Sequence, residues 1–197
     1  MDPDAYLCQL AEIFNGISVN TPSLSAIIAI ILAGLLLLAS GFASASEIAF
    51  FSLSPSDLND IEEGNHPSDG KISNLLADSE RLLATILITN NFVNVTIIML
   101  CNFFFMNVFV FHSPLAEFLI LTVILTFLLL LFGEIMPKIY SAQKTLAFCR
   151  FSAPGIYALE KVFYPIASVL VRSTTFLNKH FAKKNHNISV DELSHAL

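Results

Sequence analysis

The stretch LAEFLILTVILTFLLLLFGEIMPK, residues 115–138, decides the fold, because it joins a long apolar run to a Gly-Glu pair and a proline. Its part from Leu115 to Gly133 is about as long as a bilayer-crossing helix, which needs roughly 20 apolar residues. Two further runs, at about 24–53 and 82–111, have the same character. The sequence therefore predicts an all-α membrane protein with three transmembrane helices.

The overall composition agrees with a membrane protein and excludes several other classes. The 197 residues are 55% hydrophobic and only 13% charged, whereas soluble domains average about 25% charged residues. A formal net charge of −6 repels phosphate backbones, which argues against nucleic acid as a partner. Three cysteines without a Cys-x-x-Cys pair argue against a disulfide framework and a structural zinc site.

The positive residues predict the orientation of the three spans. Residues 1–70 and 82–137 contain no Lys or Arg, while Lys71 and Arg81 lie between the first two spans and the others follow the third. Because cytoplasmic loops carry the excess of Lys and Arg, we expect the N-terminus outside and the C-terminus in the cytoplasm.

The same reading divides the chain into four parts. Residues 1–20 form an extracytoplasmic segment, and residues 21–153 form the three-span domain with a cytoplasmic helical hairpin at 54–81. Residues 154–184 have apolar positions at helical spacing with interleaved Lys and Arg, which indicates an amphipathic juxtamembrane helix. That helix lies on the inner membrane surface, or packs against the bundle or a twin subunit. Residues 185–197 read as the start of a linker to a cytoplasmic domain outside this sequence.

Polar side chains inside the first two spans mark a candidate site, because such residues are costly in a bilayer and usually face the protein interior. In the first span, Ser40 and Ser44 share one helix face with Glu47. In the second, Asn90 and Asn94 share a face. The alternative is a small-residue packing face whose hydroxyls bond back to their own helix, with asparagines that join neighbouring helices.

The third span adds a backbone feature. Pro137 has no N–H and crowds the carbonyl of Gly133, so we expect a kink that leaves this oxygen unpaired beside Glu134. Broken helices with freed carbonyls coordinate cations in many transporters. The alternative is a helix that ends at the cytoplasmic surface, with Glu134 solvated.

The three clusters together offer hydroxyl, amide, carbonyl and carboxylate oxygens and no His or Cys. Such donors suit Mg²⁺, Ca²⁺ or Na⁺ rather than zinc or copper, and one carboxylate among neutral dipoles suits a carrier. An enzyme is not expected, because no nucleophile and base come together and the histidines fall in loops or tails: His66, His112, His180, His186 and His195.

With these residues in view, the chain resembles the transmembrane domain of the CNNM/CorC family of magnesium transport proteins. It is most similar to the gliding-motility-associated bacterial branch. The resemblance covers about residues 20–185 and is carried by three motifs: Ser40 to Glu47, Ile88 to Asn94, and Phe132 to Lys138.

The resemblance implies a multi-pass homodimer in the bacterial inner membrane, with a belt helix and a largely dehydrated Mg²⁺ site in each subunit. Ser40, Ser44, Asn90 and Glu134 would give side-chain ligands and Gly133 its carbonyl, with Asn94 a further candidate. It also implies a CBS-pair domain, absent from this sequence, through which ATP binding is linked to transport.

Two functions follow as expectations. The first is a Mg²⁺ transporter, an exporter coupled to Na⁺ entry. The alternative is a membrane-anchored scaffold or sensor that responds to Mg²⁺ without net ion flux. One position departs from the family pattern: Thr89 stands where a glycine is common, and a β-branched residue there narrows the approach between the first two spans.

Overall fold

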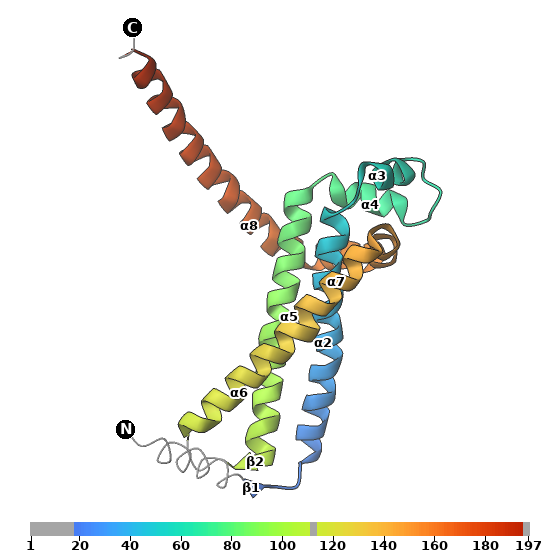
Figure 1. Ribbon diagram of the computed structural model, residues 1–197, viewed down its shortest axis with the longest axis vertical. Helices are drawn as coiled ribbons and strands as arrows, with labels where there is room; N and C mark the ends of the chain where they lie inside the picture. Colours follow the sequence, from blue (N-terminus) through green and yellow to red (C-terminus); the bar gives the residue numbers. More distant parts are fainter. Residues whose placement is uncertain (1–17, 111–113, 195–197) are drawn as a thin grey trace, which may run out of the picture.

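The computed structural model describes residues 18–110 and 114–194, in which three long helical segments dominate (Figure 1). Helix α2 spans Leu24–Phe51 and helix α5 spans Ser79–Val108. The third segment is continuous and has three parts: α6 (Pro114–Leu128), the π-helix η1 (Leu129–Ile135) and α7 (Met136–Gln143). All three segments are long and apolar enough to cross a membrane, which confirms the predicted all-α membrane fold with three spans.

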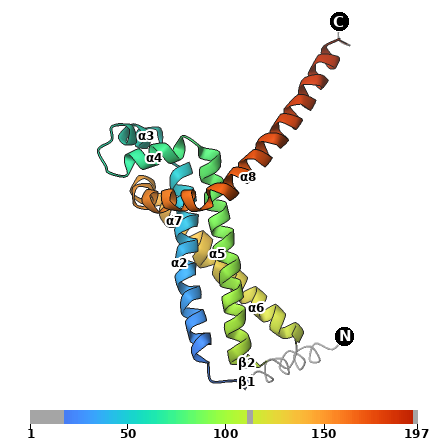
Figure 2. The same cartoon turned by 180° about the vertical axis from the view of Figure 1, so that it is seen from behind.

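The segments form a bundle in which α2 and α5 lie side by side and the third segment crosses them obliquely (Figures 1 and 2). Small residues on α2 permit the close approach, and Ala33, Gly41 and Ala45 are all buried. A Cβ added at Gly41 would lie 3.0 Å from Pro137 Cγ. Glycine at this position therefore lets α7 pack directly onto the backbone of α2.

One end of the bundle, the ribbon end, carries two short strands that the sequence did not predict. Strand β1 (Ser18–Val19) pairs antiparallel with β2 (Phe109–Val110) and so ties the chain before α2 to the end of α5. The Asn20 N–H also donates to the Val108 carbonyl at 2.7 Å. Strands of two residues are too short to leave a periodic pattern in the sequence.

The opposite end, the hairpin end, carries helices α3 (Pro55–Glu62) and α4 (Asp69–Leu76). Ser54 begins α3 with a capping box, in which its hydroxyl accepts from the Asp57 N–H and the Asp57 carboxylate accepts from the Ser54 N–H. Gly64 follows α3 with φ of +70°, a conformation that favours glycine. These local signals place the two short helices directly after the first span.

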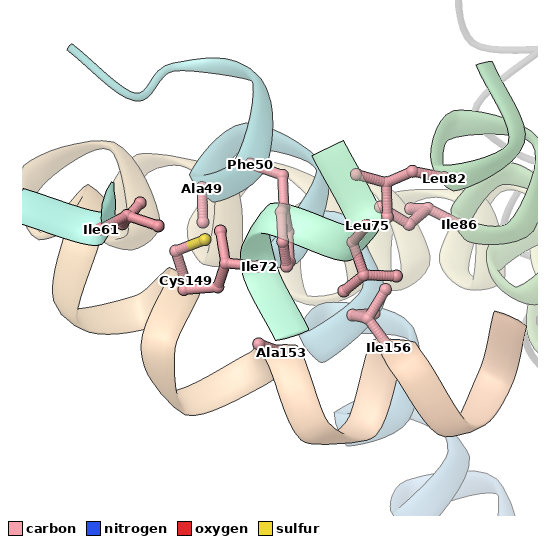
Figure 3. Close-up of a cluster of buried hydrophobic side chains, with 10 residues drawn as sticks. All are labelled: Ala49, Phe50, Ile61, Ile72, Leu75, Leu82, Ile86, Cys149, Ala153 and Ile156. Atoms are coloured by element: carbon pink, nitrogen blue, oxygen red, sulfur yellow. The ribbon is translucent and has the colours of Figure 1, made fainter. Parts of the chain in front are cut away.

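Helix α8 (Thr145–Ser194) follows the third span, crosses α5 and α2 at the hairpin end and contacts α4 (Figure 2). Its first turns bury Cys149, Ala153 and Ile156 against the hairpin. Figure 3 shows these side chains packed with residues of α2, α3, α4 and α5. Burial raises the pKa of the Cys149 thiol to about 12, so this cysteine stays protonated and acts as a packing residue.

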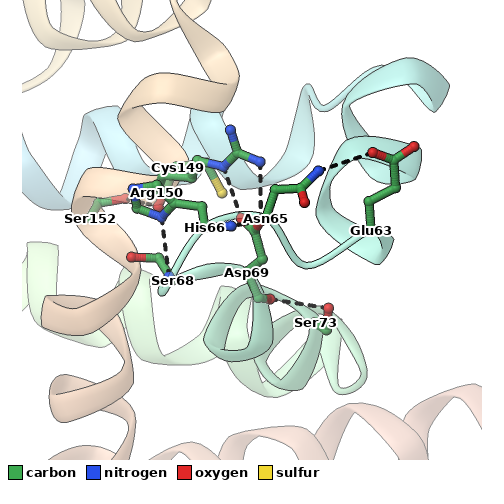
Figure 4. Close-up of polar contacts among 9 residues, drawn as sticks. All are labelled: Glu63, Asn65, His66, Ser68, Asp69, Ser73, Cys149, Arg150 and Ser152. Carbon is green, nitrogen blue, oxygen red and sulfur yellow. Dashed lines mark hydrogen bonds and ion pairs between the residues drawn. The ribbon is translucent and has the colours of Figure 1, made fainter.

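A buried ion pair fixes α8 onto α4. Arg150 donates to the Asp69 carboxylate through Nε at 2.8 Å and through an Nη atom at 3.1 Å (Figure 4). Asp69 is only 1% exposed and also accepts from the His66 N–H at 2.9 Å. The hydrogen bond from Arg150 holds the pKa of Asp69 below its ordinary value. The segment between spans one and two is thus joined to the helix after span three.

Candidate ion-binding site

The candidate site lies where α2, α5 and η1 meet, and α2 contributes two serines to it. Ser40 and Ser44 lie one turn apart and both are fully buried. A third serine on the same helix, Ser46, is equally buried, but its hydroxyl donates to the Phe42 carbonyl of its own helix at 2.7 Å. The structure therefore separates two serines that face the neighbouring helix from one that bonds back to α2.

Helix α5 contributes two of its three clustered asparagines. The Ser40 hydroxyl lies 2.8 Å from Asn90 Oδ1 and 2.7 Å from Asn94 Oδ1. Ser44 Oγ lies 3.4 Å from Asn90 Oδ1. Asn91 is exposed and donates through Nδ2 to the Leu87 carbonyl of its own helix. Asn90 and Asn94 thus face α2, while Asn91 takes no part in this cluster.

The Ser40 hydroxyl has too few protons to form hydrogen bonds with both amide oxygens. A serine hydroxyl has a single proton to donate, yet two amide oxygens lie within hydrogen-bonding distance of this one. As the side chains are oriented, only one of the two oxygen pairs can hold a hydrogen bond at a time. The other pair brings two lone-pair-bearing oxygens together without a proton, an arrangement that a positive ion would stabilise.

The spacing of these oxygens is that of ordinary O–H···O hydrogen bonds, and it is also compatible with a small ion. In an octahedral shell with metal–oxygen distances of 2.0–2.1 Å, adjacent ligands lie about 2.9 Å apart, and at the 2.3–2.6 Å typical of Ca²⁺ they lie about 3.3–3.7 Å apart. The oxygen separations of 2.7 and 2.8 Å around Ser40 are close to the smaller value.

The third span approaches the cluster through Gly133. This residue is buried, and a Cβ built on it would lie only 3.2 Å from Ser40 Oγ. It lies in η1, whose wider turns end where Met136 donates to the Leu131 carbonyl five residues back. Pro137 is the second residue of the following helix α7. π-Helical turns occur often at functional sites, and here one sets the backbone of the third span against Ser40.

Glu134 follows Gly133 and is half-buried. Within residues 18–110 and 114–194, it makes no hydrogen bond or ion pair, so the structure does not join its carboxylate to the serines and asparagines. The described residues also contain no group of three or more His, Cys, Asp or Glu side chains that could hold a metal. The assembled donors are therefore neutral oxygens, with one carboxylate in the adjacent position of the chain.

Thr89, the departure from the family pattern, is buried beside Asn90. Its hydroxyl donates to the Thr85 carbonyl of the same helix at 2.8 Å. The polar atom of this β-branched residue is therefore satisfied within α5, and the Asn90 amide next to it still reaches both serines.

Sequence reasoning missed two contacts that join α2 to α7 beside the cluster. The Ser141 hydroxyl donates to the Ala45 carbonyl at 2.6 Å, and both residues are buried. Lys138 Nζ lies 3.0 Å from Glu47 Oε2, with both side chains partly exposed. The sequence shows opposite charges at positions 47 and 138, but no local pattern indicates that two residues so far apart are in contact.

Two comparisons with known proteins cover this region. The family model described as "Cyclin M transmembrane N-terminal domain" (CNNM) matches residues 30–197, which include every residue of the cluster. The chain is also 32% identical, over 130 residues, to a "UPF0053 protein" of Haemophilus influenzae. That match covers 66% of this chain and 30% of the relative, so the chain spans about a third of the length of that protein.

Proposed function

This chain belongs to the CNNM family of transmembrane domains, and from that premise we propose that it is the membrane part of a Mg²⁺ transporter. The family is generally linked to Mg²⁺ transport and is not a known enzyme family. In this proposal the ion binds between the three spans, at Ser40, Ser44, Asn90, Asn94 and the Gly133 carbonyl. Glu134 supplies the negative charge.

The proposal rests on one observation, the single hydroxyl of Ser40 between two amide oxygens at 2.7 and 2.8 Å. Ser40 is fully buried and the two asparagines are half-buried, so water has limited access to the oxygen pair that lacks a proton. A divalent cation coordinated by these oxygens would offset the repulsion between their lone pairs.

The remaining parts of the proposal concern the cell. We place the domain as a homodimer in the bacterial inner membrane, with the ribbon end outside and the hairpin end in the cytoplasm. The Lys and Arg distribution supports this orientation. We propose export of Mg²⁺ coupled to Na⁺ entry, under the control of ATP bound to a cytoplasmic domain outside this sequence.

The test compares two buried serines of the same helix. Ser40→Ala removes the hydroxyl that faces the amides, whereas the matched control Ser46→Ala removes one that bonds back to α2. Mg²⁺ affinity of the purified protein is measured by calorimetry, and Mg²⁺ flux is measured in proteoliposomes. We expect Ser40→Ala to weaken binding at least tenfold, about 1.4 kcal/mol, and Ser46→Ala to change it less than twofold.

Equal affinities in the two variants would contradict the site. A wild-type protein that binds Mg²⁺ through Ser40 but moves no ion in proteoliposomes would contradict transport and assign the chain to the sensor alternative. A cooperative melting transition of Ser40→Ala without Mg²⁺ checks that the variant is folded. A Mg²⁺-dependent rise in melting temperature in the wild type, lost in this variant, checks that the ion stabilises the native state through Ser40.

A further inference from the structure

A second group of polar side chains lies on the bundle, away from the cluster around Ser40. Toward the ribbon end, α5 and α6 diverge (Figure 1), and an open cavity of about 430 Å³ lies between them. Its polar lining comes from Asn102 on α5 and from Glu117, Thr122 and Thr126 on α6. Within the described part of the chain, none of these four side chains has a hydrogen-bond or ion-pair partner.

These polar groups need either water or a polar partner. Asn102, Thr122 and Thr126 are exposed on the surface of the single chain, and Glu117 is half-buried. All four belong to segments long and apolar enough to cross a membrane. Polar and ionisable side chains in such segments usually face the bundle interior or a water-filled space and mark ion pathways.

The cavity is separated from the Ser40 cluster by an apolar layer. Leu125 of α6 packs with Ala33, Val93, Ile97 and Cys101, which are all buried. The same Leu125, with Leu121, also lines the cavity. Thr126 precedes Gly133 by seven residues, about two helical turns or roughly 10 Å. The cavity and the Ser40 cluster thus lie on either side of one thin apolar layer.

We propose that this cavity is a second station for the transported ion, which holds a hydrated divalent cation on the ribbon side of the apolar layer. Glu117 supplies the negative charge, and Asn102, Thr122 and Thr126 bind the water shell. This inference rests on the proposed transport function and adds a second position along the ion's path.

The volume and the four polar side chains of the lining both suit a hydrated ion. Six waters at about 30 Å³ each occupy roughly 180 Å³, which fits within 430 Å³. Mg²⁺ gives up its water reluctantly and commonly binds through one or two carboxylates with several waters retained. One carboxylate among neutral oxygens matches that mode of binding.

The charge distribution favours a cation over a second copy of the chain as the occupant. Residues 24–53 and 82–137 contain no Lys or Arg. A twin subunit packed into the cavity through its spans would therefore bring no positive side chain to Glu117. A half-buried carboxylate without a partner is unfavourable within a membrane-spanning segment, whereas a bound cation neutralises it.

Cysteine accessibility tests the site without relying on transport. In a full-length parent with Cys8, Cys101 and Cys149 replaced by alanine, Thr122→Cys is compared with Val123→Cys. Val123 is 65% exposed and lies outside the cavity lining, so it faces lipid. A charged thiosulfonate reagent is present on both faces of proteoliposomes, with and without Mg²⁺.

We expect Thr122→Cys to react at least tenfold faster than Val123→Cys, and Mg²⁺ to slow the reaction at least threefold. Glu117→Gln, in the Thr122→Cys background, is expected to abolish the Mg²⁺ protection and keep the labelling. Equal labelling of the two cysteines, protection that survives Glu117→Gln, or efficient disulfide formation between two copies through Thr122→Cys would each overturn the proposal.

A last comparison separates this inference from the proposed function. Ser40→Ala, added to Thr122→Cys, removes the inner site but leaves the cavity intact, so protection by Mg²⁺ is expected to persist. If protection persists while the wild-type protein moves no Mg²⁺, the cation site in the cavity is supported and transport is contradicted. If Ser40→Ala abolishes the protection, the cavity is not an independent station.

Discussion

Lys138 Nζ lies 3.0 Å from Glu47 Oε2, and this ion pair joins α7 to α2 on the hairpin side of the Ser40 cluster. Glu47 follows Ser44 by one helical turn, and Lys138 follows Glu134 by one turn. The two charges therefore lie directly beyond the residues proposed to hold the ion. Their attraction holds the third span against the first at this point.

A double-mutant cycle measures the strength of this pair. Glu47→Gln, Lys138→Met and the double variant are compared by their free energies of unfolding in detergent micelles. Because both side chains are partly exposed, we expect a coupling of about 1 kcal/mol, the upper end for such pairs. Lys71→Met serves as the control, since Lys71 is exposed and forms no ion pair among the described residues. A coupling near zero would contradict the contact.

Gly133 is predicted to be important for the site, because a Cβ at this position would crowd the Ser40 hydroxyl. In Gly133→Ala the added carbon would lie 3.2 Å from Ser40 Oγ and displace the hydroxyl or the third span. We expect Mg²⁺ affinity, measured by calorimetry, to fall at least tenfold.

Gly34→Ala is the matched glycine control. Gly34 lies in α2, and a Cβ there would have no heavy atom within 4 Å. We expect unchanged Mg²⁺ affinity and a gain in stability of up to about 1 kcal/mol from the higher helix propensity of alanine. If both variants bind Mg²⁺ normally, the proposed approach of the third span to Ser40 is wrong.

The neighbouring asparagines give a second matched pair. Asn90→Ala removes an amide oxygen that faces two serines, whereas Asn91→Ala removes an amide that bonds back to its own helix. We expect Asn90→Ala to weaken Mg²⁺ binding at least tenfold and Asn91→Ala to leave it within twofold. If a titration shows equal losses of Mg²⁺ affinity in the two variants, the loss does not depend on which face of α5 the asparagine occupies, and the assignment of Asn90 is wrong.

The Asp69–Arg150 pair predicts acid sensitivity at the hairpin end. Because the hydrogen bond from Arg150 lowers the pKa of Asp69, its contribution to stability is present above its unfolded pKa of about 3.9. It is lost as pH falls through the lower, folded-state pKa. We expect the amides of α4 to exchange hydrogen faster as pH falls below about 4, after correction for the intrinsic exchange rate.

Asp69→Asn should remove that pH dependence and weaken docking at neutral pH, where the wild-type carboxylate is ionised. We expect a loss of about 3 kcal/mol, the lower end for a broken buried pair, because Arg150 keeps some exposure to water. Asp57→Asn is the control, since the pKa of Asp57 is lowered mainly by the Ser54 backbone N–H at the cap of α3. An unchanged pH profile in Asp69→Asn would contradict the assignment.

Much of the architecture could be predicted from the sequence because its signals are local. Apolar runs long enough for a bilayer identified the three spans. The i, i+4 spacing placed Ser40 with Ser44 and Asn90 with Asn94. Each of these inferences uses only the period of a helix and the preferences of single residues.

Contacts between distant segments could not be predicted, because no local pattern encodes them. The sequence did not indicate that Lys138 meets Glu47 or that Arg150 meets Asp69, and it brought Gly133 near Ser40 only through the family resemblance. It predicted a kink at Pro137 that leaves the Gly133 carbonyl unpaired, and the structure has the wider turns of a π-helix at this point. The backbone conformation before Pro137 depends on how the third span packs against α2, and this packing is a property of the assembled bundle.

The Asp69–Arg150 pair also has a consequence for biosynthesis, because its two residues lie 81 positions apart. At about 5–20 residues per second, a ribosome reaches the codon for Arg150 roughly 4–16 s after that for Asp69. Throughout that interval the Asp69 carboxylate has no Arg150 guanidinium to pair with, so α4 cannot complete its packing against α8. The hairpin end can therefore be completed only after the third span has been translated, which makes it a late step in the folding of the nascent chain.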